Sequence, residues 1–574
     1  MAKPHGSADA ADLIREADVA APMRDGVLLR GDVFRPAGPG RFPALILRTP
    51  YGRTGDPDEL RFARRAVGRG YAVVLQDVRG RHGSEGAFTP HAHEGRDGFD
   101  SIEWLAAQPW CDGRVGSFGL SYAGSVQWFA ALENPPHLLA MAPAMTFARL
   151  RDAVRSQGVL DMDWLRWAYV AIAPDLRVRA GLPGPADIPA AEADWARCGA
   201  ALLATLPLLD LPELDGCLAF LRDWLTHPQD DSWWDFGDVA GKYDRVTAAV
   251  LNLAGWHDDA FTVAGAVENH RGLVAARARK GAEPRSMLVL GPWSHGINAV
   301  TGDARFGTRD FGPAARLDYD GLVLDFMDRH VRGRRNVLAG VAPVSCFFMG
   351  GNAWRVGPEW PPAGTREFLL HLAAGPEQAD GVGRLALLPP DCGPEGSVFA
   401  ADPSRPVAET PGSGLGAVDH ADLRGPGVLL FETAPLASAL TVAGRIRAEI
   451  FLTADVPDLD LYVRLLDVAP DGAAFNLMDI GAEVARVGLL GGPLAADEVR
   501  RVPIDTPHTA NVFLAGHRVR LAVFASWRPG MSLNLQTGAS EVASAAMRPA
   551  RVTIRHCAAQ PSRIVLPLLP PPRA

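Results

Sequence analysis

The chain has 574 residues, a length that allows three or four domains at about 150 residues each. Hydrophobic residues make up 48% and charged residues 21%, a mixture that excludes a disordered chain and a coiled-coil rod. The 66 Asp and Glu residues outnumber the 57 Lys and Arg residues and give a net charge of −9, so there is no basic surplus for binding nucleic acid.

The cysteines and apolar runs give expectations about location and cofactors. The six cysteines are scattered and form no CxxC pair, which predicts reduced thiols, no disulfide framework and no zinc site. No apolar run reaches 18 residues, and the first twenty residues carry charges where a signal peptide would be apolar. We therefore expect a cytoplasmic protein with no membrane contact, no metal and no cofactor. The oligomeric state stays open between a monomer and a homodimer.

Residues 25–145 alternate apolar strand-like runs with helical spacing. The predicted elements are a strand at 42–48, a helix at 60–67, a strand at 70–77, a helix at 97–107 and a strand at 114–119. Continuous apolar strands that alternate with helices are typical of a parallel sheet covered by helices on both faces.

The alternating pattern stops at residues 146–242, which are rich in Ala, Leu, Arg and Trp and predict helices. These helices are expected to be broken at Pro174, Pro183, Pro189 and Pro207. The α/β pattern then resumes, with strands predicted at 247–255 and 286–291 and a closing helix at 322–331. We therefore predict one discontinuous α/β domain, residues 1–145 and 243–343, with residues 146–242 inserted as a helical cap domain.

Residues 344–574 show little helical periodicity and many short alternating runs, for example at 445–452, 459–466 and 517–524. Turn signals such as Asp471-Gly472 and Ala515-Gly516 separate the runs. Many short strands with polar and apolar alternation predict a two-sheet β-sandwich, most simply a jelly roll, as the C-terminal domain.

The sharpest local motif surrounds Ser121, which directly follows the predicted strand at 114–119 and precedes a helical run. This strand–turn–helix context is typical of a nucleophile elbow, where small neighbours allow a tight turn. Gly119 lies two residues before the serine. Ala123 lies two residues after it, where the usual pattern has glycine, and Gly124 follows. The alternative interpretation is an ordinary strand-to-helix turn.

A nucleophilic serine needs a base and a carboxylate that orients the base. In α/β-hydrolases the chain order is Ser, then Asp or Glu, then His, each after a later strand. Asp258 follows the strand predicted at 247–255, and His295 follows the strand predicted at 286–291. Open α/β sheets place their sites at such strand ends. Asp259 stays open as the acid, and a solvated turn and a satisfied loop histidine are the structural alternatives.

An oxyanion hole requires two hydrogen-bond donors. One is expected from the backbone N–H of the residue after the nucleophile, here Tyr122. The loop after the first strand contains no Gly-rich run, but Tyr51 offers a phenol hydroxyl that is neutral at pH 7. The alternative for Tyr51 is a packing residue.

These motifs together resemble the cocaine esterase/X-Pro dipeptidyl-peptidase (S15) family of hydrolases. The resemblance spans about residues 23–569 and rests on several separate segments. They are residues 77–86, 110–116 and 118–124, Gly255-Trp-His-Asp258, Gly291-Pro-Trp-Ser-His295, and residues 326–333, 347–354 and 511–518.

The resemblance implies an α/β-hydrolase domain with an inserted helical cap and a C-terminal jelly-roll β-sandwich. It also implies roles for the motif residues: Ser121 as nucleophile, His295 as base, Asp258 as orienting acid, and the Tyr51 hydroxyl and Tyr122 N–H as the oxyanion hole. Asp258 is preferred over Asp259 because the family spacing is Trp-x-Asp. A cap tryptophan lines the acyl pocket in the cocaine esterase branch, which implies Trp167, or less directly Trp164, with Phe261 beside it. The alternative for these aromatics is helix core.

The implied reaction is cleavage of a small-molecule ester or amide through an acyl-enzyme. We favour esters with a bulky or aromatic acyl group. The α-amino ester hydrolases of the family use a carboxylate cluster after the acid, and here only Asp259 follows Asp258. X-Pro dipeptidyl-peptidase and β-lactam or α-amino ester acylase activities are the alternatives.

Two other classes of protein stay open. The chain could be a non-enzymatic binding protein whose jelly roll holds a ligand, since such folds host lectins. A metal hydrolase built on His91, His93 and Glu94 lacks the helical HExxH spacing, so a solvated loop is the favoured interpretation of that segment.

Overall fold

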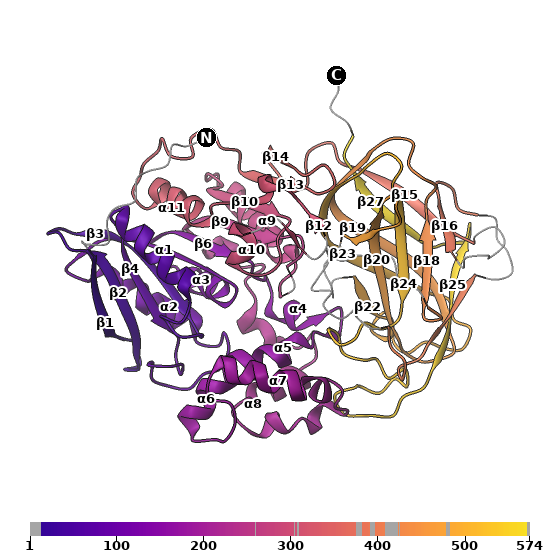
Figure 1. Ribbon diagram of the computed structural model, residues 1–574, viewed down its shortest axis with the longest axis horizontal. Coiled ribbons are helices and arrows are strands. Elements are labelled where there is room, and N and C mark those ends of the chain that lie inside the picture. Colours follow the sequence, from indigo (N-terminus) through magenta and orange to yellow (C-terminus); the bar gives the residue numbers. More distant parts are fainter. Residues whose placement is uncertain are drawn as a thin grey trace.

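The computed structural model describes residues 13–258, 260–302, 305–306, 309–374, 382–390, 396–407, 423, 425–477 and 483–570. Figure 1 shows an α/β region, a helical region beneath it in magenta, and a C-terminal β region in orange and yellow. Among the described helices, none is both long and apolar enough to cross a membrane.

The α/β region contains one mixed sheet with the strand order β1-β2-β4-β3-β5-β6-β9-β10-β13-β14. The strands from β4 through β13 run parallel to their neighbours, whereas β1, β2 and β14 pair antiparallel. The bounds are β1 Leu13–Pro22, β2 Leu28–Pro36, β3 Phe42–Thr49, β4 Ala72–Asp77, β5 Cys111–Leu120, β6 Leu138–Ala144, β9 Ala249–Gly255, β10 Ser286–Gly291, β13 Val344–Phe348 and β14 Ala353–Gly357.

Every strand predicted for this region is confirmed, and the parallel core strands read as continuous apolar runs because both of their faces are covered. The sequence interpretation missed β1 and β2, which form the antiparallel edge. The domain boundary at residue 343 stays a prediction, and the two strands that follow it extend the α/β sheet, since β13 pairs with β10 and β14 pairs with β13. A short apolar run does not reveal which of two neighbouring sheets it will join.

Helices cover the sheet on both faces, as predicted. Helices α1 (Pro57–Gly68) and α11 (Tyr319–His330) bury Phe62 and Phe326 against one face. Helices α2 (Glu94–Ala106) and α3 (Tyr122–Leu132) pack on each other over the opposite face. Helix α9 (Val263–Arg279) packs beside β9 and β10, and the short α10 (Ile297–Thr301) follows β10.

The helical region lies between β6 and β9 in the sequence. Its main elements are α4 Leu150–Val154, the short pair β7 Arg155–Ser156 and β8 Val159–Leu160, α5 Asp163–Trp167, a π-helical turn Ala168–Ile172, α6 Ala173–Ala180, α7 Ile188–Leu203 and α8 Ala219–Thr226. Pro189 occupies the first turn of α7, where no backbone donor is needed, so it begins that helix instead of breaking one, whereas Pro174 directly follows the π-helical turn within a continuous helical run.

The C-terminal β region is built largely from antiparallel pairs, with β16 and β18 parallel. The bounds are β15 Arg366–Ala373, β16 Val382–Ala386, β17 Ser397–Ala401, β18 Val428–Glu432, β19 Leu440–Ala454, β20 Asp460–Val468, β21 Ala474–Asn476, β22 Val484–Arg486, β23 Arg500–Phe513, β24 Arg518–Phe524, β25 Ala550–Cys557, β26 Gln560–Pro561 and β27 Arg563–Leu568. The β-rich class is confirmed, and the jelly-roll connection order stays a prediction.

The C-terminal β region touches the cap through the segment after β24. The Met162 N–H donates to the Gly530 carbonyl at 2.8 Å, and the Leu160 N–H donates to the Ser532 hydroxyl at 3.1 Å. Residues more than 350 positions apart in the sequence therefore form one wall.

Candidate active site

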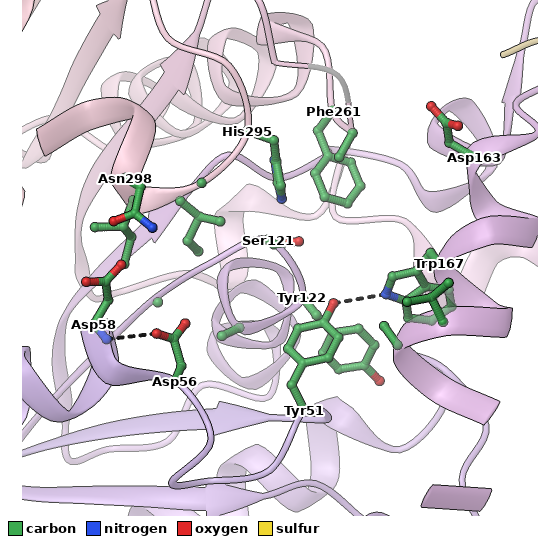
Figure 2. A pocket seen from close by; sticks show the side chains of 18 of the residues that line it. Tyr51, Asp56, Asp58, Ser121, Tyr122, Asp163, Trp167, Phe261, His295 and Asn298 are labelled. Atoms are coloured by element: carbon green, nitrogen blue, oxygen red, sulfur yellow. Dashed lines mark hydrogen bonds between the residues drawn. The ribbon is translucent and has the colours of Figure 1, made fainter. Parts of the chain in front are cut away.

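A cavity of about 810 Å³ opens at the carboxyl ends of the sheet strands, below the cap. The predicted site residues on its wall are Tyr51, Ser121, Tyr122, Trp164, Trp167, Phe261 and His295. Asp258 lies behind His295 with its side chain fully buried. Figure 2 shows the side chains of His295, Ser121 and Tyr51 pointing into the same space. The fold thus gathers residues from the segments that follow β3, β5, β9 and β10 and from helix α5.

Ser121 occupies the turn between β5 and α3 in a strained conformation, with φ 64° and ψ −125°. A non-glycine residue with positive φ is uncommon and persists where surrounding structure holds it. Its backbone N–H donates to the Ala144 carbonyl of β6 at 3.0 Å, and its carbonyl accepts from the Gly124 N–H at 2.9 Å. The turn therefore has the geometry of a nucleophile elbow.

Two glycines explain which residues occupy the motif around Ser121. A Cβ on Gly119, which has φ 140°, would lie 2.7 Å from the Ala123 Cβ. A Cβ on Gly124 would lie 2.7 Å from the Ala144 carbonyl oxygen. Glycine is therefore required at 124, where α3 meets β6, while position 123 has room for an alanine.

The loops that carry Asp258 and His295 are joined through their backbones. The Trp256 N–H donates to the Gly291 carbonyl at 2.7 Å, and the His257 N–H donates to the Trp293 carbonyl at 3.0 Å. A Cβ on Gly255 would lie only 2.1 Å from the Trp293 carbonyl oxygen. The Gly-Trp pattern thus lets two parallel strand ends approach closely enough to align the two functional loops.

Asp258 and His295 form a directed pair. The Oδ1 atom of Asp258 lies 2.9 Å from Nδ1 of His295 and also accepts the backbone N–H groups of Ala260 and Phe261 at 3.0 and 2.9 Å. A carboxylate on Nδ1 fixes the tautomer in which Nε2 is the proton acceptor. Asp259, the other acid considered, lies outside the described residues.

Tyr51 lies in the loop after β3, and its hydroxyl is held by a residue of the cap. The indole N–H of Trp167 donates to the Tyr51 oxygen at 3.0 Å (Figure 2). Burial raises the pKa of Tyr51, and hydrogen bonds with Trp167 and Ser121 oppose that rise. The phenol is therefore neutral at pH 7, and a hydroxyl that accepts from Trp167 keeps its own proton for donation into the cavity.

Tyr122 is the first residue of α3, so its N–H is one of the unpaired donors at the positive end of a helix. Its side chain turns away from the reaction space, and its hydroxyl donates to Oε1 of Glu94 at 2.9 Å. The backbone N–H of Tyr122 therefore lies at the start of α3, whereas its hydroxyl is bound to Glu94.

The cap side of the cavity is aromatic. Trp164 packs edge-on against Trp167 at 5.2 Å and against Phe261 at 5.8 Å between ring centroids, and Trp167 stacks on Trp224 at 6.2 Å. Phe261 in turn packs edge-on against the His295 ring at 5.7 Å. An apolar wall next to the Asp258–His295 pair suits a flat or bulky apolar group of a bound ligand.

Three features of this site were missed or misread from the sequence. His91 and Glu94 are each 3% exposed and lie beneath Tyr122, so the solvated loop expected for this segment is wrong for both residues. Gly530 and Met531 bring the C-terminal β region onto the cavity wall. The buried Arg81 donates to the Pro50 carbonyl at 2.8 Å and to the Ile172 carbonyl at 2.7 Å, linking the Tyr51 loop to the cap.

The rest of the cavity wall is acidic. Among the described lining residues, the charged side chains are Asp56, Asp58, Glu59, Asp161, Asp163 and Glu192 against Arg166. Burial and the neighbouring carboxylates of Asp56 and Asp77 raise the pKa of Glu59 to about 8. The remaining carboxylates still outnumber the arginine, which makes the entrance unfavourable for anions.

Comparisons with known proteins match most of the chain. The family model described as X-Pro dipeptidyl-peptidase (S15 family) matches residues 25–297, and the model of the X-Pro dipeptidyl-peptidase C-terminal non-catalytic domain matches residues 337–565. A cocaine esterase from Rhodococcus sp. (strain MB1 Bresler) is 32% identical over 588 residues, covering 96% of this chain and 98% of the relative.

Solved structures show the same fold. An α-amino acid ester hydrolase superposes with a TM-score of 0.81 at 23% identity, and an aminopeptidase from the marine sediment archaeon Thaumarchaeota archaeon superposes with a TM-score of 0.79 at 23% identity. Each comparison covers 99% of this chain and 98% of the other. The fold, the family models and the full-length relative together show that the chain belongs to the X-Pro dipeptidyl-peptidase (S15) family of serine hydrolases.

Proposed function

We propose that this protein is a carboxylesterase that cleaves esters with a bulky or aromatic acyl group through a Ser121-His295-Asp258 triad. The observation that carries the proposal is the 2.9 Å contact between Asp258 and His295, in a cavity shared with the strained Ser121. The cocaine esterase relative, which is named for an ester substrate, supports this choice of reaction.

The proposed reaction proceeds through an acyl-enzyme. The Ser121 hydroxyl attacks the ester carbonyl carbon while His295 Nε2 takes its proton, and Asp258 stabilises the imidazolium that forms. The tetrahedral oxyanion accepts hydrogen bonds from the Tyr51 hydroxyl and the Tyr122 N–H, each worth about 3 kcal/mol in the transition state. His295 then protonates the departing alcohol, and water releases the acid by the same steps.

The aromatic wall supports the choice of acyl group. Trp164, Trp167 and Phe261 border the space beside Ser121, so a flat acyl group would bury its surface there while the alcohol portion faces the acidic entrance. That entrance disfavours anionic esters. The proposed partner is thus a neutral or cationic small molecule.

Replacing Ser121 by alanine tests the chemistry. We expect Ser121→Ala to lose hydrolysis of a p-nitrophenyl ester and labelling by a fluorophosphonate, because both reactions need the hydroxyl. The matched control is Ser397→Ala, which removes a hydroxyl of β17 that bonds His556 at 3.0 Å, far from the cavity. Activity of Ser121→Ala near that of the control would exclude this mechanism.

A substrate panel separates the competing activities. The α-amino acid ester hydrolase structure and the S15 family model keep amino-ester and X-Pro substrates in consideration. We expect a benzoyl ester to be cleaved with higher kcat/KM than an X-Pro anilide or a β-lactam side-chain amide. A preference for the anilide would favour the peptidase alternative, and failure of the fluorophosphonate to label Ser121 would favour a binding role.

A further inference from the structure

The side chain of Tyr122 is anchored on the side away from the substrate. Its hydroxyl donates to Glu94 Oε1 at 2.9 Å and accepts the backbone N–H of His91 at 3.0 Å. Its ring stacks on the His91 imidazole, with centroids 4.3 Å apart and planes 21° apart. The residue that follows the nucleophile is therefore held by two hydrogen bonds and by the stacking of its ring on His91.

The acceptor of that hydroxyl belongs to a buried ion pair. Glu94 Oε2 lies 2.9 Å from Arg48 Nη2, and both side chains are only 4% exposed. Arg48 also donates to the Glu94 carbonyl at 3.0 Å and to Gln76 Oε1 at 3.1 Å. Arg48 is part of β3, three residues before Tyr51. One ion pair thus contacts both the strand that leads to Tyr51 and the side chain of Tyr122.

The stability of the fold gives only a weak reason for burying the Arg48–Glu94 ion pair. Removing two charges from water costs several kcal/mol per ion, and apolar replacements of such pairs are often neutral or stabilising. Neither Arg48 nor Glu94 lines the cavity, so neither contacts a substrate. What the pair does provide is a fixed point beneath an elbow whose central residue has φ 64°.

We propose that the Arg48–Glu94 pair is a positioning unit that holds Tyr122 by its hydroxyl and so sets its N–H relative to the Tyr51 hydroxyl. This inference rests on the proposed function, because it concerns the geometry of that oxyanion hole. A loosened Tyr122 would let the strained elbow relax and would move one donor away from the oxyanion. The neutral carbonyl of the bound substrate depends less on the two donors than the oxyanion does. A misplaced donor therefore weakens binding of the transition state more than binding of the substrate.

The test compares tyrosine variants that lose the same kind of hydrogen bond. Tyr122→Phe removes the hydroxyl and keeps the ring and the N–H. The matched control is Tyr71→Phe, since the Tyr71 hydroxyl is equally buried and donates to the Asp328 carboxylate at 2.9 Å on the α11 side of the sheet. Glu94→Gln is the second variant, which keeps an acceptor but removes the charge that faces Arg48.

The readouts separate positioning from stability. For Tyr122→Phe and Glu94→Gln we expect kcat on a p-nitrophenyl ester to fall about tenfold with KM within about twofold, as for small misplacements of catalytic groups. Affinity for a boronic acid, which forms a tetrahedral anion on the serine, should fall by the same factor. Tyr71→Phe should lower the Tm similarly and leave kcat unchanged.

Three results would overturn the inference. A Tyr122→Phe enzyme with wild-type kcat and boronate affinity but a Tm like that of Tyr71→Phe would show that the hydroxyl only stabilises the fold. Activity of Ser121→Ala near wild type would remove both the proposed function and this role. A Ser121-dependent enzyme with unaltered Tyr122→Phe kinetics would remove the positioning role alone.

Discussion

The two walls of the cavity are held in different ways. The wall formed by the sheet is fixed by backbone hydrogen bonds between loops, by glycines that leave no room for a Cβ, and by buried ion pairs. The cap wall is fixed mainly by ring packing among Trp164, Trp167, Trp224 and Phe261. Aromatic packing tolerates changes of shape better than a strained turn does. We infer that the first wall determines the chemistry and the second the choice of substrate.

The largest effect is expected at the acid of the sheet wall. Asp258→Asn should lower kcat about 10⁴-fold, since an amide would favour the wrong tautomer of His295. Asp259→Asn is the matched control and should keep kcat near wild type. Steady-state kinetics on one ester measures both. A reversed result would transfer the acid role to Asp259.

Rigidity of the same wall is tested by adding one methyl group. Gly255→Ala would place its Cβ 2.1 Å from the Trp293 carbonyl oxygen, and we expect it to lose at least about 2 kcal/mol of unfolding free energy together with activity. Gly38→Ala, where no heavy atom lies within 4 Å, should change neither. Urea unfolding gives the comparison. A stable, active Gly255→Ala protein would mean that the two loops can separate without consequence.

The cap wall should respond in selectivity and much less in chemistry. Trp164→Ala should reduce kcat/KM for a benzoyl ester about tenfold while changing an acetyl ester much less, because only the larger group fills the aromatic space. The control is Trp195→Ala, which lies on α7 and outside the cavity. It should leave kcat/KM unchanged for both the benzoyl and the acetyl ester. Equal losses on both esters would indicate that Trp164 supports the chemistry itself.

The smallest effect concerns pH and Glu59. Its pKa is raised to about 8, so the folded state binds this proton more tightly than the unfolded state does. The contribution of protonated Glu59 to the free energy of unfolding is fully present below about pH 4.5 and is lost as pH rises toward 8. Glu59→Gln should therefore gain Tm relative to wild type as pH increases from 5 to 9. Thermal melts across that range test the sign, and parallel curves for the two proteins would contradict it.

Much of the fold was predictable because its signals are local. The runs at 42–48, 70–77 and 286–291 are buried parallel strands, and continuous apolar sequence of that length indicates such strands. The pairing of β13 and β14 with the α/β sheet was missed because pairing partners depend on distant residues. His91 and Glu94 were misread for the same reason, since their partner Tyr122 lies about thirty residues away.

The sequence by itself determined the identities and chain order of Ser121, Asp258 and His295, and it placed each one after a strand. These features follow from residue chemistry and short-range periodicity. Only the tertiary structure decided that Trp167 donates to Tyr51, that Arg48 and Glu94 meet beneath Tyr122, and that Met531 reaches the cavity. Such contacts arise from the packing of the sheet, the cap and the C-terminal β region against one another, and no local pattern encodes that packing.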